Sequence, residues 1–222
     1  MSTKIPAEAP VRSAEALSRT AGGRKSTTRK SPQARHQEIR DAAVDVALEE
    51  GLAAITLRRV ARQLGVASGL VAHYEPRIEE FVAATFARIA AQDRAEVVAA
   101  RDAADDVAGR LSGLLGSSLD PERLPVTAVW VEAWGLGRRN ETLAGTVRTE
   151  MDAWQEMLRE GIEDGLEAGI YSVADPAAAA WQILGMIDGL NAQALVRWEG
   201  VTGRREHFLE AVEHLLGRSA AR

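Results

Sequence analysis

The chain of 222 residues has no cysteine, only four histidines and few aromatic side chains. Without cysteine it can form neither a disulfide nor a thiolate metal site, and we expect no metal ion and no cofactor. No apolar run reaches the length of about 18 residues that a membrane span needs, and the N-terminus lacks the charged-then-apolar order of a signal peptide. These absences predict a soluble, cytoplasmic protein without a membrane partner.

Patterns that would indicate catalysis are also missing. The histidines show neither metal-ligand spacing nor a Glu-x-x-His pair; they are His36, His73, His207 and His214. No alternating apolar pattern of a strand occurs, and no glycine-rich phosphate loop follows one. The sequence therefore predicts an all-α protein that is not an enzyme.

The net charge of −5 is distributed unevenly along the chain. Residues 1–40 hold nine lysines and arginines against three acidic residues, a net charge of +6 that leaves −11 for the remainder. A basic end on an acidic body concentrates the attraction for a polyanion at that end. Residues 1–33 lack aromatic side chains, which predicts a disordered arm. Its basic cluster at residues 24–30 could follow a phosphate backbone or enter a minor groove, with Arg29 and Lys30 as the candidate DNA contacts. A plain solvated tail is the alternative.

Two short helices hinged at a glycine are predicted at 56–63 and 67–73. The first has a single apolar stripe, formed by Leu57, Val60, Ala61 and Leu64. Thr56 is its N-cap, and Gly65 can take the left-handed conformation that ends a helix. Another amphipathic helix at 34–50 completes a three-helix unit, the pattern of a DNA-reading helix-turn-helix.

The residues around this hinge resemble one known family. From Ile55 to Tyr74 the order is Ile-Thr-Leu-Arg-x-Val-Ala-x-x-Leu-Gly-Val-x-x-Gly-Leu-Val-x-His-Tyr, after a helix that ends in Glu-Gly and before Glu79-Glu80-Phe81. This order is similar to that of the tetracycline-repressor (TetR) family over roughly residues 35–90. The resemblance implies an all-helical homodimer whose N-terminal domain binds DNA. It implies DNA contacts at Thr56, Arg58, Ala67, Ser68, Gly69, Leu70, His73 and Tyr74.

Four positions depart from the family pattern. The family commonly has a serine at Ala67, where it caps the recognition helix, and a tyrosine at Ala72. An aromatic residue is usual at Glu75, and a phosphate-contacting lysine at Ile78. Arg77 is our candidate for the phosphate contact that this lysine would make.

The rest of the chain is helical in pattern, with helices expected over 77–100, 103–117, 121–137, 141–168, 175–198 and 203–217. We assign residues 1–33 to the arm, 34–80 to the DNA-binding domain and 81–222 to a C-terminal domain. By the resemblance, this C-terminal domain binds a small-molecule effector and forms the homodimer.

Large aromatic and methionine side chains on these helices predict an adaptable apolar cavity, with ordinary core packing as the alternative. The candidate ligand contacts are Phe86, Trp130, Trp134, Trp154, Met157, Met186 and Asn191. Met151 shares a helix face with Trp154, and Asp188 is a further polar group that could orient an effector. A structural hydrogen bond is the alternative role of Asn191.

Small residues beside leucines in the last two helices permit close helix approach. Two such helices from each of two copies would form an intermolecular four-helix bundle. The candidate interface residues are Ala180, Leu184, Ile187, Ala194, Leu195, Phe208, Val212 and Leu215. The segment 175–195 also resembles the C-terminal domain of the betaine-responsive branch of the family.

Together these features predict a ligand-responsive transcriptional repressor. Its two recognition helices would enter successive major grooves roughly 34 Å apart, so its double-stranded DNA operator should be near-palindromic. The sequence identifies neither the effector nor the operator. The alternative is a helical adaptor that binds proteins and has no sequence-specific affinity for DNA.

Overall fold

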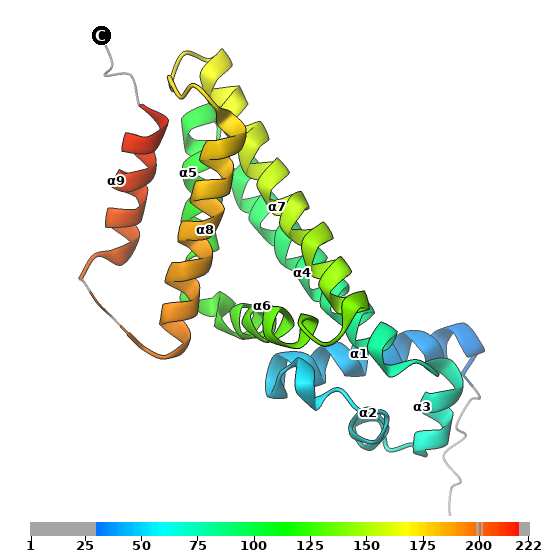
Figure 1. The fold of residues 1–222 in the computed structure, drawn as a ribbon. Helices are drawn as coiled ribbons and strands as arrows, with labels where there is room; N and C mark the ends of the chain where they lie inside the picture. The colour runs from blue at the N-terminus through cyan, green and yellow to red at the C-terminus, as the bar shows by residue number, and fades with distance from the viewer. Residues whose placement is uncertain (1–29, 199, 201, 218–222) are drawn as a thin grey trace, which may run out of the picture. The chain divides into compact units, whose positions relative to one another are not determined.

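Nine α-helices and two short 3-10 turns make up the described part of the chain (Figure 1). The structure is a computed structural model that describes residues 30–198, 200 and 202–217. By their contacts the described residues from Pro32 to Gly217 form one unit. The elements are α1 (Pro32–Glu50), η1 (Leu52–Ala54), α2 (Leu57–Leu64), α3 (Ser68–Tyr74), α4 (Ile78–Asp102), α5 (Val107–Ser118), η2 (Pro121–Arg123), α6 (Leu124–Gly137), α7 (Glu141–Glu167), α8 (Pro176–Leu195) and α9 (Arg204–Leu216).

The all-α prediction is confirmed, since no strand occurs among the described residues. The predicted arm lies outside them up to Arg29, and only its Lys30 and three following residues are described. Two predicted helices need correction. Residues 121–123 form the 3-10 turn η2 ahead of α6, and the helix predicted to reach residue 198 ends at Leu195, with Arg197 in a left-handed conformation at φ 56°.

The helix-turn-helix forms through the two local signals that the sequence carries. The hydroxyl of Thr56 accepts a hydrogen bond from the backbone N–H of Arg59, 3.1 Å away, and so caps α2. Gly65 ends α2 at φ 65° and ψ 33°, a left-handed conformation that costs a glycine little. Ala67 gives α3 no side-chain cap, which confirms the expectation drawn from the missing serine.

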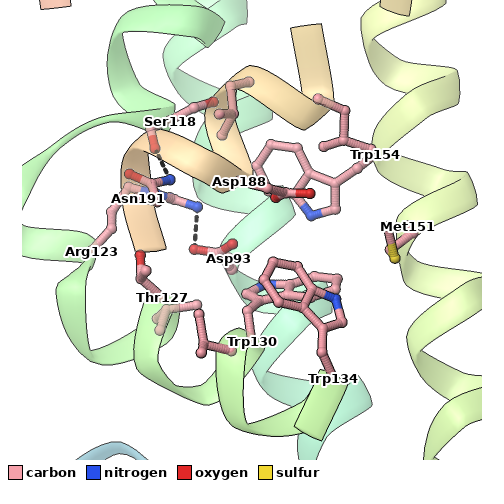
Figure 2. Close-up of a pocket in the computed structure, with 14 residues that line it drawn as sticks. Asp93, Ser118, Arg123, Thr127, Trp130, Trp134, Met151, Trp154, Asp188 and Asn191 are labelled. Carbon is pink, nitrogen blue, oxygen red and sulfur yellow. Dashed lines mark hydrogen bonds and ion pairs between the residues drawn. The ribbon is translucent and has the colours of Figure 1, made fainter. Parts of the chain in front are cut away.

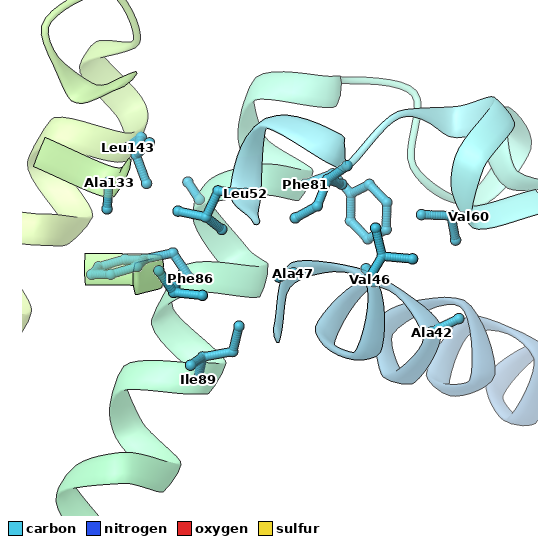
Figure 3. Close-up of a cluster of buried hydrophobic side chains, with 14 of the residues drawn as sticks. Ala42, Val46, Ala47, Leu52, Val60, Phe81, Phe86, Ile89, Ala133 and Leu143 are labelled. Atoms are coloured by element: carbon cyan, nitrogen blue, oxygen red, sulfur yellow. The ribbon is translucent and has the colours of Figure 1, made fainter. Parts of the chain in front are cut away.

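A buried cluster joins the helix-turn-helix to the helices that follow it (Figure 3). Val46, Leu52 and Val60 of α1, η1 and α2 pack with Phe81 at the start of α4. The same cluster continues through Phe86 and Ile89 of α4, Val129 and Ala133 of α6, and Leu143 and Val147 of α7. The reading head, which comprises α1, η1, α2 and α3, therefore packs on α4 and α6. The domain boundary at residue 80 stays a prediction.

A second buried cluster holds the C-terminal helices together. The long helices α4 and α7 run side by side, and α5 and α8 pack against α7 (Figure 1). Val97, Leu111, Leu158, Ile162, Ile183 and Phe208 are among the members of this cluster. Helix α9 packs against α5 and α8. None of the described helices is long and apolar enough to cross a membrane.

Candidate functional site

Helix α3 presents a short polar surface to solvent. Ser68, Gly69 and His73 are exposed, Leu70 is half-buried, and Val71 is fully buried and anchors the helix. The exposed side chains are those predicted to read DNA. A Ser hydroxyl can bond to several base edges, and a histidine can reach a base or a phosphate.

Tyr74 and Glu75 tie the end of α3 to α1. The Tyr74 ring stacks on His36, with 5.7 Å between ring centroids, and meets the ring of His73 edge-on. Oε1 of Glu75 lies 2.7 Å from Nε2 of His36 and accepts a hydrogen bond from Nε of Arg40 at 3.1 Å. Glu75, where the family pattern has an aromatic residue, is therefore a structural clamp that the sequence did not reveal.

The other candidate DNA contacts lie on the same part of the chain. Thr56 and Arg58 are exposed at the start of α2, and Lys30 is exposed ahead of α1. Arg77, the candidate substitute for the family lysine, is 73% exposed in its side chain and forms an ion pair with Glu80 at 2.7 Å. A phosphate would therefore compete with Glu80 for the guanidinium of Arg77.

A cavity of about 50 Å³ opens between α4, α6, α7 and α8, with α5 and η2 at one side (Figure 2). Its lining residues are Asp93, Ser118, Arg123, Val126, Thr127, Trp130, Val131, Trp134, Met151, Trp154, Leu184, Ile187, Asp188 and Asn191. The cavity is mostly apolar and aromatic, with a few polar groups among the apolar side chains. This composition is typical of a small-molecule site.

Two carboxylates and one guanidinium are the only charged groups in this lining. Asp93 is 4% exposed and forms an ion pair with Arg123. Asp188 has no hydrogen bond or ion pair with any residue in the described part of the chain. Burial raises the pKa of each carboxyl to about 6, for Asp93 against the lowering effect of Arg123. With both carboxylates ionised, the lining carries one uncompensated negative charge.

Three indoles line the cavity together with these charged groups (Figure 2). Trp130 lies 6.3 Å from Trp134 between ring centroids, and the Arg123 guanidinium lies over the Trp154 ring at 5.9 Å from its centroid. The indole Nε1 atoms of Trp134 and Trp154 are buried and find no acceptor among the described residues. Each N–H is therefore a donor whose hydrogen bond is not made within the described part of the protein.

The structure brings together four of the seven candidate ligand contacts. Trp130, Trp134, Trp154 and Asn191 line the cavity, whereas the other three do not. Phe86 is fully buried and packs edge-on against Trp130 at 4.9 Å, so it supports the wall from behind. Asn191 donates to the backbone carbonyl of Ser118 at 2.9 Å, the structural bond predicted as its alternative role.

The two methionines among the candidates lie away from this cavity, in two different places. Met157 is 5% exposed and belongs to the core between α7 and its neighbours. Met186 lines a groove between α8 and α9, together with Trp181, Gln182, Gly185, Ala211 and Leu215. Sequence reasoning also missed Arg123, which lies in a turn without periodicity. Asp93 did carry a signal, because it falls four residues from both Ile89 and Val97 on the buried face of α4.

The residues predicted as dimer contacts differ in their exposure within one protomer. Ala180, Leu184, Ile187, Phe208 and Val212 are buried within the protomer, where they pack in the second core cluster. Their side chains are therefore not available to a partner in this conformation. Ala194, Leu195 and Leu215 are half-buried. The exposed face of α8 instead carries Trp181, which is 66% exposed beside the α8–α9 groove.

Known proteins similar to the chain are transcriptional regulators. The family described as BetI-type transcriptional repressor, C-terminal, matches residues 109–220. The HTH-type transcriptional regulator BetI of Rhizobium meliloti (strain 1021) is 30% identical over 158 residues, which cover 70% of this chain and 75% of that protein.

Solved structures share the fold. A TetR transcription regulator from Haloarcula marismortui ATCC 43049 has a TM-score of 0.69 at 20% identity, covering 82% of this chain and 96% of that chain. A protein from Saccharomonospora viridis, solved in complex with choline, has a TM-score of 0.72 at 21% identity, covering 81% of this chain and 96% of that chain.

Proposed function

Because the chain belongs to the TetR family of transcriptional regulators, in its BetI-type branch, we propose that it is a homodimeric repressor which a small organic cation releases from its operator. As a member of a family of regulators, the chain is not an enzyme. We choose a cation as the ligand because two carboxylates and a single guanidinium line the cavity together with three indoles.

The charges in the cavity favour a cation over an anion or a neutral molecule. Asp188 loses part of its hydration in the fold without gaining a partner among the described residues, and an ammonium group would supply that partner. A quaternary ammonium needs no hydrogen-bond acceptor, and the face of a tryptophan is the aromatic surface that attracts it most. Trp130, Trp134 and Trp154 supply such faces next to the carboxylates.

The free indole N–H groups of Trp134 and Trp154 favour a ligand with an oxygen at its other end. Choline combines a quaternary ammonium with a hydroxyl, and the structural neighbour from Saccharomonospora viridis was solved with choline. The small volume of the cavity excludes a much larger cation unless the walls move. We therefore take choline and its close relatives as the first candidates.

We assign DNA binding to the side of α3 that carries the exposed Ser68 and His73 and the half-buried Leu70. Ser68, Leu70 and His73 would meet base edges, while Thr56, Arg58 and Tyr74 would lie near phosphates. Arg77 and Lys30 would add further phosphate contacts, which position the protein without reading sequence. Two such surfaces in a homodimer would recognise a near-palindromic operator.

The groove between α8 and α9 is our candidate dimer surface, with a second copy of the chain as its occupant. Gly185 has no atom within 4 Å of the place where a Cβ would lie, so another helix can approach its backbone closely. Trp181 beside it offers the large exposed aromatic area that is typical of an interface anchor.

The test combines cation binding with operator release. Calorimetry should show choline binding, and much weaker binding of 3,3-dimethylbutan-1-ol, the uncharged carbon analogue. Asp188→Asn should weaken choline binding, whereas Asp152→Asn, an exposed aspartate on α7, is the matched control. Choline should then release the protein from its own upstream DNA.

Two outcomes would contradict the proposal. Equal affinity for choline and its uncharged analogue would show that the positive charge of the ligand does not contribute to binding. Equal binding to scrambled DNA at two salt concentrations would favour the helical adaptor, because a repressor must prefer its operator beyond the salt-dependent attraction of phosphates.

A further inference from the structure

We infer that Arg123 is a built-in surrogate for the cationic effector, whose ammonium binds between Asp188 and Asp93 and replaces the Arg123 guanidinium as the counter-charge of Asp93. The inference rests on the proposed function, and it concerns what occupies the cation position in the ligand-free protein. It assigns Arg123 the role of an internal competitor rather than a ligand contact.

The surroundings of Arg123 are those that a bound organic cation would need. Its guanidinium forms an ion pair with the buried carboxylate of Asp93 and lies over the ring of Trp154. A carboxylate and an indole face are the two groups that stabilise a cation in a partly dehydrated site. The side chain of Arg123 is 15% exposed, so it fills this position instead of lying across the surface.

The guanidinium of Arg123 can move to a second position. On the far side of Arg123 is an acidic surface pocket lined by Glu96, Asp120 and Glu122, and this pocket shares Asp93, Arg123 and Val126 with the cavity. Asp93, Arg123 and Val126 therefore line both the cavity and the acidic pocket, which adjoin one another at these residues. The three exposed carboxylates attract a cation from solution and can also receive the displaced guanidinium.

Exchange of one cation for another keeps Asp93 neutralised throughout. A buried carboxylate left alone would be strongly unfavourable, and a neutral molecule that displaced Arg123 would leave it so. An entering ammonium replaces the charge that leaves. The presence of Arg123 thus makes the cavity select a cation over a neutral molecule of the same shape. It also lowers the apparent affinity for the cation, which must displace Arg123 in order to bind.

Displacement of Arg123 also acts on the helix that follows it. Arg123 is the last residue of η2, and α6 begins at Leu124. The backbone N–H of Arg123 bonds to the carbonyl of Asp120 at 3.0 Å, which holds the turn together. Movement of the side chain into the acidic pocket therefore changes the charge distribution at the N-terminus of α6, the helix that carries Trp130 and Trp134.

The first test measures tetramethylammonium binding by calorimetry at about pH 8, with sodium at equal ionic strength as the blank. Arg123→Gln removes the competitor and should tighten binding by about tenfold or more. Arg123→Lys keeps a cation beside Asp93 and should stay within about threefold of the wild type. Arg148→Gln, which breaks the exposed ion pair with Glu141 on α7, is the matched control and should change nothing.

Weaker or unchanged binding by folded Arg123→Gln overturns the inference while leaving the proposed function intact. If neither the wild type nor either Arg123 variant binds the cation, the proposed function itself is contradicted. Circular dichroism melting shows whether each variant folds.

A second measurement uses the wild-type protein and decides the question if Arg123→Gln does not fold. Tetramethylammonium should expose Arg123, so trypsin should cut after this residue several-fold faster with the cation present. The cut after Arg148 provides the internal reference. Equal or slower cutting after Arg123 in the presence of saturating cation contradicts displacement.

Discussion

The side chain of Glu132 on α6 accepts a hydrogen bond from the backbone N–H of Ala53, with 3.3 Å between Oε2 and the nitrogen. Ala53 belongs to η1 of the reading head, whereas Trp130 and Trp134 on the same helix line the cavity. Helix α6 therefore contacts both sites. Gly51 lies so close to this carboxylate that a Cβ there would overlap it, at 2.3 Å from Oε1.

Glu132→Ala is expected to separate cation binding from DNA release. Loss of one hydrogen bond should lower the free energy of unfolding by about 0.5–1.5 kcal/mol. The Kd for choline should stay unchanged, while more choline is needed to release half of the bound operator. Glu132→Gln keeps an acceptor oxygen for Ala53 and serves as the control. Identical release curves for Glu132→Ala and the wild type would show that this contact does not transmit the signal.

Cation binding should depend on pH through Asp188. Burial raises the pKa of this carboxyl to about 6, and a bound cation favours its ionised form. Between about pH 5 and pH 7.5, the Kd for choline should therefore fall by about tenfold. Asp188→Asn should flatten this dependence, with a remainder from Asp93, whose pKa is also about 6 and which faces Arg123. A Kd for choline that does not depend on pH would mean that choline binds at a site away from Asp188 and Asp93.

Stability without ligand should show the opposite trend. The folded-state pKa of both carboxyls exceeds their ordinary value of 3.8, so the folded protein binds more protons than the unfolded chain between the two values. The free energy of unfolding should therefore fall as pH rises from about 4 to about 6. Thermal unfolding across this window checks the sign, and Asp188→Asn should reduce the slope.

The reading head could be predicted from the sequence because its signals are local. Thr56 and Gly65 lie at the ends of α2, and each acts on the backbone within a few residues. The charge arrangement of the cavity could not be predicted, because Asp93 and Arg123 come from α4 and η2 and meet only in the fold. The apolar residues of α8, among them Ala180, Leu184 and Ile187, show another limit. Their pattern indicates that one face of the helix is buried, but it does not distinguish burial in the protomer's own core from burial against a partner.

The clamp at Glu75 should support DNA binding without affecting the cavity. Glu75→Ala removes the contacts with His36 and Arg40 and should lower the free energy of unfolding by about 1 kcal/mol. Operator affinity should also fall, because the end of α3 loses its tie to α1. Glu49→Ala, an exposed position near the end of α1, is the control. Weakened choline binding by Glu75→Ala would contradict this separation.

Ser68→Ala and His73→Ala should change operator preference more than folding. Both side chains are exposed, and a lost base contact is worth about 1–3 kcal/mol of discrimination. Val71→Ala, in the same helix but fully buried, should instead destabilise the fold by about 2 kcal/mol. Selection of bound sequences from a random DNA pool, together with thermal unfolding, distinguishes these effects. A large drop in melting temperature for His73→Ala would mean that the side chain supports the fold.

The α8–α9 groove makes the dimer testable at a single residue. Trp181→Glu places a charge in the middle of the candidate interface and should weaken dimerisation on the order of 100-fold. Trp198→Glu is the matched control, because Trp198 is 58% exposed but does not line the groove. Sedimentation should show monomers for the first variant and dimers for the second. Since Trp181 lies outside the effector cavity, the monomer should still bind choline while losing operator affinity; a dimer that survives Trp181→Glu would require a different interface.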